Sequence, residues 1–271
     1  MNSHRLFIAT LIFVGLQSVA SAQTAWKDYY QRRAEQDYEL VLADQQSPLV
    51  LKPEAIVNWT NPLEQGQING STFVWENEGR PIVVGQLFSY LIGDDIRSLC
   101  HVFTTLSDRQ VTGRRNGEVF WQPTPSEKSS WHAFETAPAP ASNRAARLLQ
   151  MRNLARQFSA YTDEASRGKR DLRLLPQPLY RSDETITDYD AGLFAYVVGT
   201  DPELLILIEC AATQKESSWR YRFVQSTQST TVATLKNEQV YHYEKSRHDP
   251  GSPNASYLSR HGIEIIDAEL K

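Results

Sequence analysis

Apolar and polar positions along the chain follow two different periods, which together predict helices and antiparallel strands. Two segments repeat apolar residues every three or four positions, the period of a helix with one buried face. They run from Trp26 to Ala43 and from Asn143 to Tyr161. Asn143, or Ser142 before it, is placed to cap the second segment, because either side chain can accept a hydrogen bond from the first turn. We therefore expect one principal helix at the start of each half of the chain.

The clearest strand signal is a hairpin between Thr72 and Phe88, where β-rich residues flank the turn residues Asn77–Gly79. The connections that follow are too short for crossover helices, so the strands should pair antiparallel. The fold class is therefore predicted as α+β, with a mainly antiparallel curved sheet and two principal helices. Further strands are predicted at residues 55–59, 97–106, 117–121, 171–181, 192–199, 204–210, 218–226, 230–235, 239–243 and 262–267.

Two of these strands carry more specific predictions. Leu204–Ile208 is apolar without alternation, which is typical of a central strand covered on both faces. The strand at residues 218–226 alternates aromatic residues with Arg220 and Arg222, so one face should be apolar and the other polar.

Residues 122–142 interrupt the pattern with four prolines and many small polar residues. They are predicted to be a linker, or a surface loop within one domain. The flanking segments, residues 23–121 and 143–271, each consist of a helix followed by antiparallel strands, and we expect them to pack as one compact unit. They share no sequence motif long enough to indicate a repeat.

The first 22 residues read as a secretory signal peptide. Arg5 precedes the apolar run Leu6–Leu16, and Ala20–Ala22 has the small residues that a signal peptidase requires. The run is too short to span a membrane, which takes about 20 apolar residues, and no lipid-bearing cysteine follows Ala22. We therefore expect cleavage before Gln23, a periplasmic or extracellular location and no stable membrane insertion.

Charge and cysteine content limit the partners and the redox chemistry. The 28 basic and 32 acidic residues give a net charge of −4, which argues against nucleic acid as a partner. Cys100 and Cys210 are the only cysteines. Outside the reducing cytosol they could form one disulfide, and the alternative is two separate buried thiols that behave as small apolar groups.

The motifs of phosphate-binding loops, zinc proteases and serine hydrolases do not occur in the chain. Its histidines are scattered, so we expect no metal or cofactor. The weak catalytic candidates are His101, Glu209 and Arg181. His101 and Glu209 each share a strand face with apolar residues, where burial would raise the pKa of a carboxyl and suit it to acid catalysis. The simpler interpretation is structural: a hydrogen-bonded histidine and a glutamate paired with an arginine.

Two surface patterns suggest binding. Four arginines recur along the second helix: Arg144, Arg147, Arg152 and Arg156. They form either a solvated face or a docking face for an acidic partner. Tyr241–Lys245 alternates aromatic and polar residues, which is typical of a sheet edge that binds sugars or peptides, and equally of cross-strand packing.

Residues 172–181, with the sequence LRLLPQPLYR, resemble a block in a group of uncharacterised exported bacterial proteins. In that group the block follows a helix like residues 145–152 and precedes a segment like residues 192–203, which contains GTDPE. The hairpin at residues 72–85 is also similar. The resemblance covers much of the mature chain but implies no activity and no site residues.

Taken together, these patterns favour an exported, non-catalytic binding or structural module of the bacterial envelope. Its partner would be a small ligand, a polysaccharide or a protein. The alternative is a hydrolase with a site assembled across strands from His101, Glu209 and Arg181, which requires these three residues to share a pocket.

Overall fold

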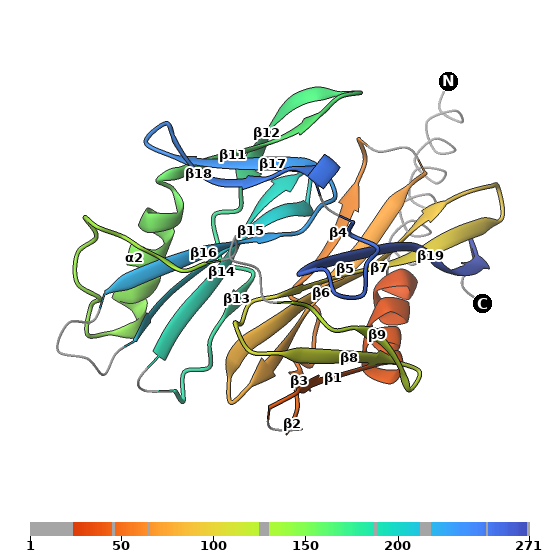
Figure 1. Cartoon of the computed structure of the whole chain (residues 1–271), viewed down its shortest axis with the longest axis horizontal. Coiled ribbons are helices and arrows are strands. Elements are labelled where there is room, and N and C mark those ends of the chain that lie inside the picture. Colours follow the sequence, from red (N-terminus) through yellow and green to blue (C-terminus); the bar gives the residue numbers. More distant parts are fainter. Residues whose placement is uncertain are drawn as a thin grey trace, which may run out of the picture.

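A computed structural model describes residues 24–44, 47–63, 66–124, 130–186, 189–211, 218–247 and 249–269. The predicted signal peptide lies outside these residues. Antiparallel strands dominate the described chain, and two α-helices lie at opposite ends of the molecule (Figure 1). The predicted fold class is confirmed: a mainly antiparallel, curled β-structure with two helices. Neither helix is long and apolar enough to cross a membrane.

The first half begins with the helix of residues 24–37. Its strands are β1 (Tyr38–Leu42), β2 (Ser47–Pro48), β3 (Val50–Leu51), β4 (Val57–Asn61), β5 (Ile68–Asn77), β6 (Arg80–Leu91), β7 (Ile96–Thr105), β8 (Val111–Arg115) and β9 (Glu118–Trp121). The predicted hairpin is confirmed as β5 and β6.

The second half contains α2 (Arg144–Ala155) and a short 3-10 helix at Lys245–Arg247. Its strands are β10 (His132–Ala133), β11 (Phe158–Glu164), β12 (Gly168–Leu174), β13 (Tyr180–Arg181), β14 (Tyr189–Val198), β15 (Asp201–Ala211), β16 (Trp219–Gln225), β17 (Thr230–Leu235), β18 (Glu238–Tyr243) and β19 (Tyr257–Asp267). The unalternating run Leu204–Ile208 is buried and lies in β15, between β14 and β16, as predicted for a central strand.

Both predicted helices are too long at their C-terminal ends. The helices end at residue 37 and at Ala155, and the residues that follow form β1 and β11. In β11, Phe158, Ala160 and Thr162 are buried alternately, so their apolar spacing fits a strand as well as a helix. Pairing with β8 and β17 then satisfies the backbone of β1 and β11. The predicted cap is correct, since the Asn143 side chain accepts a hydrogen bond from the Ala146 backbone N–H.

The two halves repeat one topology. In the first half the strands pair in the order β2-β1-β8-β9, and in the second half in the order β12-β11-β17-β18. Each half also contains a three-stranded meander, β5-β6-β7 or β14-β15-β16, and a short strand, β4 or β13, pairs with the first meander strand. The chain therefore consists of two copies of one unit, although its sequence shows no repeat.

A shared irregularity supports this duplication. The register of the β5–β6 hairpin shifts by one residue directly after Pro81, and that of the β14–β15 hairpin directly after Pro202. A proline cannot donate a ladder hydrogen bond, and a bulge accommodates it. The same bulge at the same hairpin position is expected of two copies of one unit.

The two copies pack through their meanders. In each copy the helix covers one face of the meander and forms a separate core with it. The opposite faces meet in a third apolar cluster that joins residues of both halves, such as Val74 and Val84 with Leu205 and Leu207. The order of layers is thus helix, sheet, sheet, helix (Figure 1).

The copies also exchange strands. After β9 the chain crosses to the second half, where β10 pairs with β16, and after β18 it returns to the first half, where β19 pairs with β7. The described part of residues 122–142 is thus more than the predicted linker or surface loop, because it carries β10, a strand of the second half's sheet. The exchange pairs the edge of β7, and a short part of the edge of β16, with backbone from the other copy.

The possible disulfide is absent, and the alternative of two separate thiols holds. Cys100 lies in β7 and Cys210 in β15, both buried and free, and they belong to different apolar clusters. The reason is topological: β7 and β15 belong to different sheets. Burial raises the pKa of Cys100 to about 11 and that of Cys210 to about 12, so both thiols are protonated and unreactive near neutral pH.

Candidate functional site

The structure places His101 in the core of the first half. Its ring is 2% exposed, packs against Phe103 and Phe120, and has Nδ1 2.9 Å from the Tyr38 hydroxyl oxygen. Burial, assisted by nearby cations such as Arg115, lowers the pKa of His101 to about 3. The imidazole is therefore neutral and shielded from solvent, as in the structural interpretation of this residue.

Glu209 and Arg181 lie on opposite faces of the second meander. The Glu209 carboxylate faces the junction between the halves, where it accepts hydrogen bonds from the Tyr189 hydroxyl at 2.7 Å and from Arg220 Nε at 2.7 Å. Arg181 instead binds Asp190 on the face covered by α2. With His101 in the other half, the three predicted candidates share no pocket.

Asp190 is the most heavily paired carboxylate among the described residues. It is fully buried in β14, and its oxygens lie 2.7 Å from Arg147 Nε, 2.8 Å from an Arg181 nitrogen and 3.4 Å from Arg144 Nη1. Burial alone would raise the pKa of Asp190, but the hydrogen bonds from Arg181 and Arg147 outweigh it and the pKa is lowered. The cluster fixes the start of α2 to the sheet.

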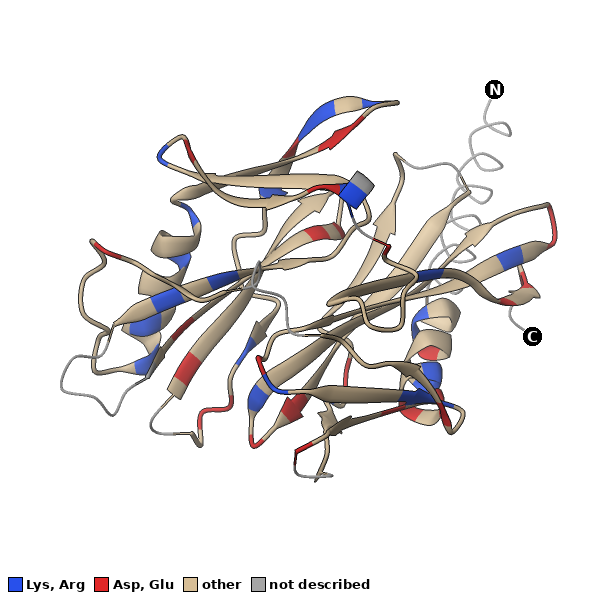
Figure 2. Ribbon diagram, in the orientation of Figure 1, with Lys and Arg blue, Asp and Glu red and all other residues tan. Residues whose placement is uncertain are grey.

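This cluster corrects the interpretation of the arginines on the second helix. Arg144 and Arg147 are half-buried and do not form a free docking face for an acidic partner, because they bind the protein's own Asp190. Figure 2 shows the basic residues along α2. Of the remaining two, Arg156 is exposed and Arg152 is half-buried.

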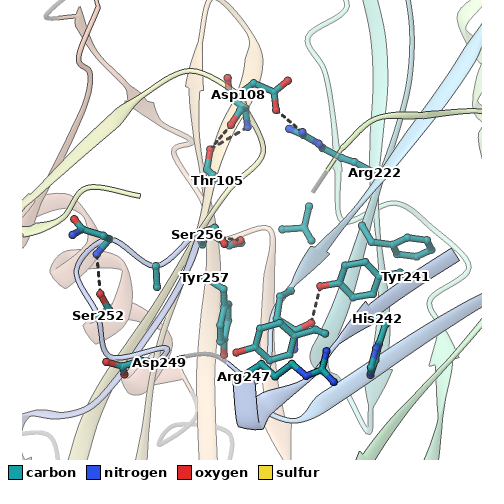
Figure 3. Close-up of a pocket in the computed structure, with 18 residues that line it drawn as sticks. Thr105, Asp108, Arg222, Tyr241, His242, Arg247, Asp249, Ser252, Ser256 and Tyr257 are labelled. Carbon is teal, nitrogen blue, oxygen red and sulfur yellow. Dashed lines mark hydrogen bonds and ion pairs between the residues drawn. The ribbon is translucent and has the colours of Figure 1, made fainter. Parts of the chain in front are cut away.

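The candidate site is a pocket of about 320 Å³ at the junction of the two halves (Figure 3). The first half contributes the end of β7 and the loop after it, and the second half contributes β16, β18 and the segment leading into β19. Its lining residues are Thr104, Thr105, Ser107, Asp108, Arg222, Phe223, Val224, Gln225, Tyr241, His242, Tyr243, Arg247, Asp249, Ser252, Asn254, Ala255, Ser256 and Tyr257.

One wall of this pocket is aromatic. Tyr243 and Tyr257 meet edge to face with ring centroids 5.9 Å apart. The Tyr241 hydroxyl donates to Gln225 Oε1 at 3.0 Å, and Figure 3 shows Tyr241 and Tyr257 in the lining of the pocket. The predicted binding edge, Tyr241–Lys245, therefore supplies part of the pocket, since Tyr241, His242 and Tyr243 all line it. The same segment also serves cross-strand packing, because β18 pairs with β17.

The lining of the pocket also contains a buried cation. Arg222 is 1% exposed and donates to the Leu106 carbonyl oxygen and to Asp108 Oδ1, each at 2.6 Å. Its guanidinium also lies 4.7 Å from the ring centroid of Trp131. Asp108 is largely exposed, on the loop between β7 and β8. This ion pair ties the second half to a loop of the first half and holds the pocket wall in place.

A second pocket of about 310 Å³ also lies between the halves and shares Tyr257 with the first. Its wall is more strongly charged, with Glu164 and Arg167 from the β11–β12 hairpin and Glu203 from β15. Arg167 Nε lies 3.8 Å from Glu164 Oε2, and the Ser229 hydroxyl donates to the same carboxylate. Neither pocket provides a metal site: among the residues placed by the structure, no group of three or more His, Cys, Asp or Glu could hold a metal ion.

Several pocket residues were not recognised from the sequence. Asp108 and Arg222 are far apart in the chain and are adjacent only because the two copies pack together. The segment Asp249–Asn254 was predicted only as a turn-rich loop, although it leads into the exchanged strand β19. The alternation of Tyr241 and Tyr243 was the one local signal that pointed to this site.

We compared the chain with protein-family models, with curated proteins and with solved structures, and none of these comparisons finds a match.

Proposed function

We propose that this protein is an exported, non-catalytic ligand-binding module of the bacterial envelope, and that the pocket lined by Arg222 and Tyr257 holds its ligand. The main support is the position and lining of that pocket. It lies where both copies meet, and it combines aromatic rings with convergent polar groups, which is the usual composition of a small-molecule site.

Rigid surroundings support the same proposal. The Arg222–Asp108 pair bridges the halves at 2.6 Å, and the segment at residues 249–256 is tied to the first half, since the Gln122 and Thr124 amides donate to the Pro253 and Asn254 carbonyls. A pocket whose walls are fixed before binding loses less conformational entropy when a ligand enters.

The proposal is tested with a pocket-filling variant. Asn254 is exposed at the rim, so Asn254→Trp should occupy the pocket without disturbing the core, and Gln239→Trp on the same sheet outside the pocket is the matched control. We expect at least one class in a panel of sugars, amino acids, nucleosides and carboxylic acids to raise the melting temperature of the wild type and of Gln239→Trp, but not of Asn254→Trp. No response to any class, or an equal response in Asn254→Trp, would contradict the proposal.

The proposed location has its own test. Mass spectrometry of the protein recovered from outside the cytosol of a bacterial host should give a chain that begins at Gln23. An exported protein that retains Met1 would contradict cleavage, and protein found only in the cytosol would contradict export.

A further inference from the structure

The pocket at the junction has two kinds of surface that a single ligand must match. One kind is the aromatic wall of Tyr241, Tyr243 and Tyr257. The other is a set of neutral hydroxyl and amide groups that donate and accept hydrogen bonds. The residues of this second kind with exposed surface are Ser107, Ser252, Asn254 and Ser256.

The charged residues of the pocket are compensated within the protein. Arg222 pairs with Asp108 at 2.6 Å, and Arg247 pairs with Glu244 at 2.5 Å. Asp249 accepts a hydrogen bond from the Gly251 amide at 3.0 Å. A carboxylate or phosphate ligand would have to displace Asp108 from Arg222 or Glu244 from Arg247. An ammonium ligand would lie beside the guanidinium groups of Arg222 and Arg247, which line the same pocket. The pocket therefore favours a ligand without net charge.

The rim of the pocket lies at the edge of a sheet. β18 is the last strand in its sheet, and the pocket residues His242 and Asn254 are both exposed. A volume of about 320 Å³ lies at the small end of the range for ligand sites. Such a pocket suits a compact unit whose continuation leaves past the rim into solvent.

On these grounds we infer that the ligand is a neutral saccharide, either free or as a unit of a longer glycan. A sugar ring has an apolar face of C–H groups, which packs on aromatic rings, and a rim of hydroxyls, which need many neutral donors and acceptors. The pocket offers both surfaces, because the three tyrosines and residues of the Ser252–Ser256 segment all line it. Figure 3 shows Tyr241, Tyr257, Ser252 and Ser256 around it. This inference rests on the proposed function and specifies the class of ligand.

The test is a titration with defined sugars, followed by isothermal calorimetry of the best binder. The probes are neutral oligosaccharides of glucose, galactose, mannose and N-acetylglucosamine, with uronic-acid oligosaccharides, amino acids and nucleotides as charged competitors. We expect a neutral oligosaccharide to bind, and Asn254→Ala and His242→Ala each to weaken it tenfold or more. Gln239→Ala, outside the pocket, should bind within twofold of the wild type, and circular dichroism checks that all variants fold.

Matched probes separate neutral from anionic ligands. A uronic-acid oligosaccharide differs from the corresponding neutral oligosaccharide by its carboxylates, so we expect the wild type to bind it at least tenfold more weakly. Equal or tighter binding of the uronic-acid oligosaccharide would overturn the inference.

The possible failures are distinguishable. Binding of only charged probes, abolished by Asn254→Trp, would overturn the saccharide inference while supporting a ligand site in this pocket. Absence of binding by every probe would overturn the saccharide inference and, together with an unresponsive melting temperature, the proposed function as well.

Discussion

The two copies fix their helices at equivalent positions with different chemistry. Asn69 and Asp190 are each the second residue of the first meander strand. In the first copy, the Tyr30 hydroxyl donates to Asn69 Oδ1 at 2.7 Å and lies 2.6 Å from Ser89 Oγ. In the second copy, Asp190 binds three arginines. Topology is therefore retained while a neutral hydrogen-bonded anchor is replaced by a buried ionic one, which is more costly to break.

The terminal hairpins of the copies also differ, and this difference makes the candidate site. In the first copy, Phe120 and Trp121 of β9 are buried in the core beneath the helix, and Trp121 Nε1 donates to the Ala255 carbonyl at 2.8 Å. In the second copy, Tyr241 and Tyr243 of the longer strand β18 line the pocket. The pocket thus arises where the duplicated units have diverged.

The strongest test of the anchor comparison removes the buried carboxylate. Asp190→Ala leaves three arginines without their shared partner, so we expect a loss of about 3–5 kcal/mol in the free energy of unfolding. Asn69→Ala, at the equivalent position, should cost only about 1–2 kcal/mol because it removes a neutral hydrogen bond. Urea unfolding of both variants measures the difference. Equal losses would show that the two anchors do not differ in strength.

The pH dependence of stability should also separate the copies. The folded-state pKa of His101 is lowered to about 3, chiefly by burial, against about 6.5 in the unfolded chain. Above pH 6.5 the imidazole is neutral in both states, so the free energy of unfolding does not depend on His101. As the pH falls from 6.5 towards 3, only the unfolded chain binds the proton, so the free energy of unfolding decreases by up to about 1.4 kcal/mol per pH unit. Since the pKa of Asp190 is lowered below 3.8, its contribution is lost only at more acidic pH.

The corresponding measurement is urea unfolding at pH 7 and pH 5 for the wild type and His101→Phe. The wild type should lose more stability than the variant between these two values, because only the wild type must protonate a buried imidazole. Identical pH dependence in the two proteins would contradict the buried, neutral state of His101.

A smaller effect is expected from single hydroxyls at the helices. Tyr30→Phe removes the hydroxyl that binds Asn69 and Ser89, and should cost about 1–2 kcal/mol because it leaves buried polar groups unpaired. Tyr196→Phe is the matched variant in the second copy, where the hydroxyl donates to the Ala155 carbonyl at 3.0 Å. It should cost less, about 0.5–1 kcal/mol, since the Asp190 cluster also fixes α2. A larger loss for Tyr196→Phe would contradict this ranking.

The sequence predicts the strands of the two meanders well, but it misses β1, β8 and β11 and the long-range arrangement. Alternation is a local signal, so β5, β6, β15 and β17 are found close to their observed bounds. The helix ends are wrong because Tyr38 and Phe158 fit both helical and strand spacing. The duplication is not visible because it lies in pairing order and in bulges beside Pro81 and Pro202, which periodicity does not reveal.

The candidate site is partly predictable for the same reason. The aromatic alternation of Tyr241 and Tyr243 identifies one wall from local sequence alone. The other wall depends on the packing of the copies, which brings Asp108 to Arg222, and on the return of the chain into β19, which places Ser256 and Tyr257 beside β18. Contacts of this kind follow from the tertiary fold rather than from any neighbouring residues in the chain.

The most direct test of the central claim is a crystal structure of the protein with the oligosaccharide that binds most tightly in solution. The account predicts a sugar ring packed against Tyr243 and Tyr257, with hydroxyls hydrogen-bonded to the Ser252–Ser256 segment. A saturated crystal in which the sugar lies elsewhere on the molecule, with this pocket empty, would contradict the account.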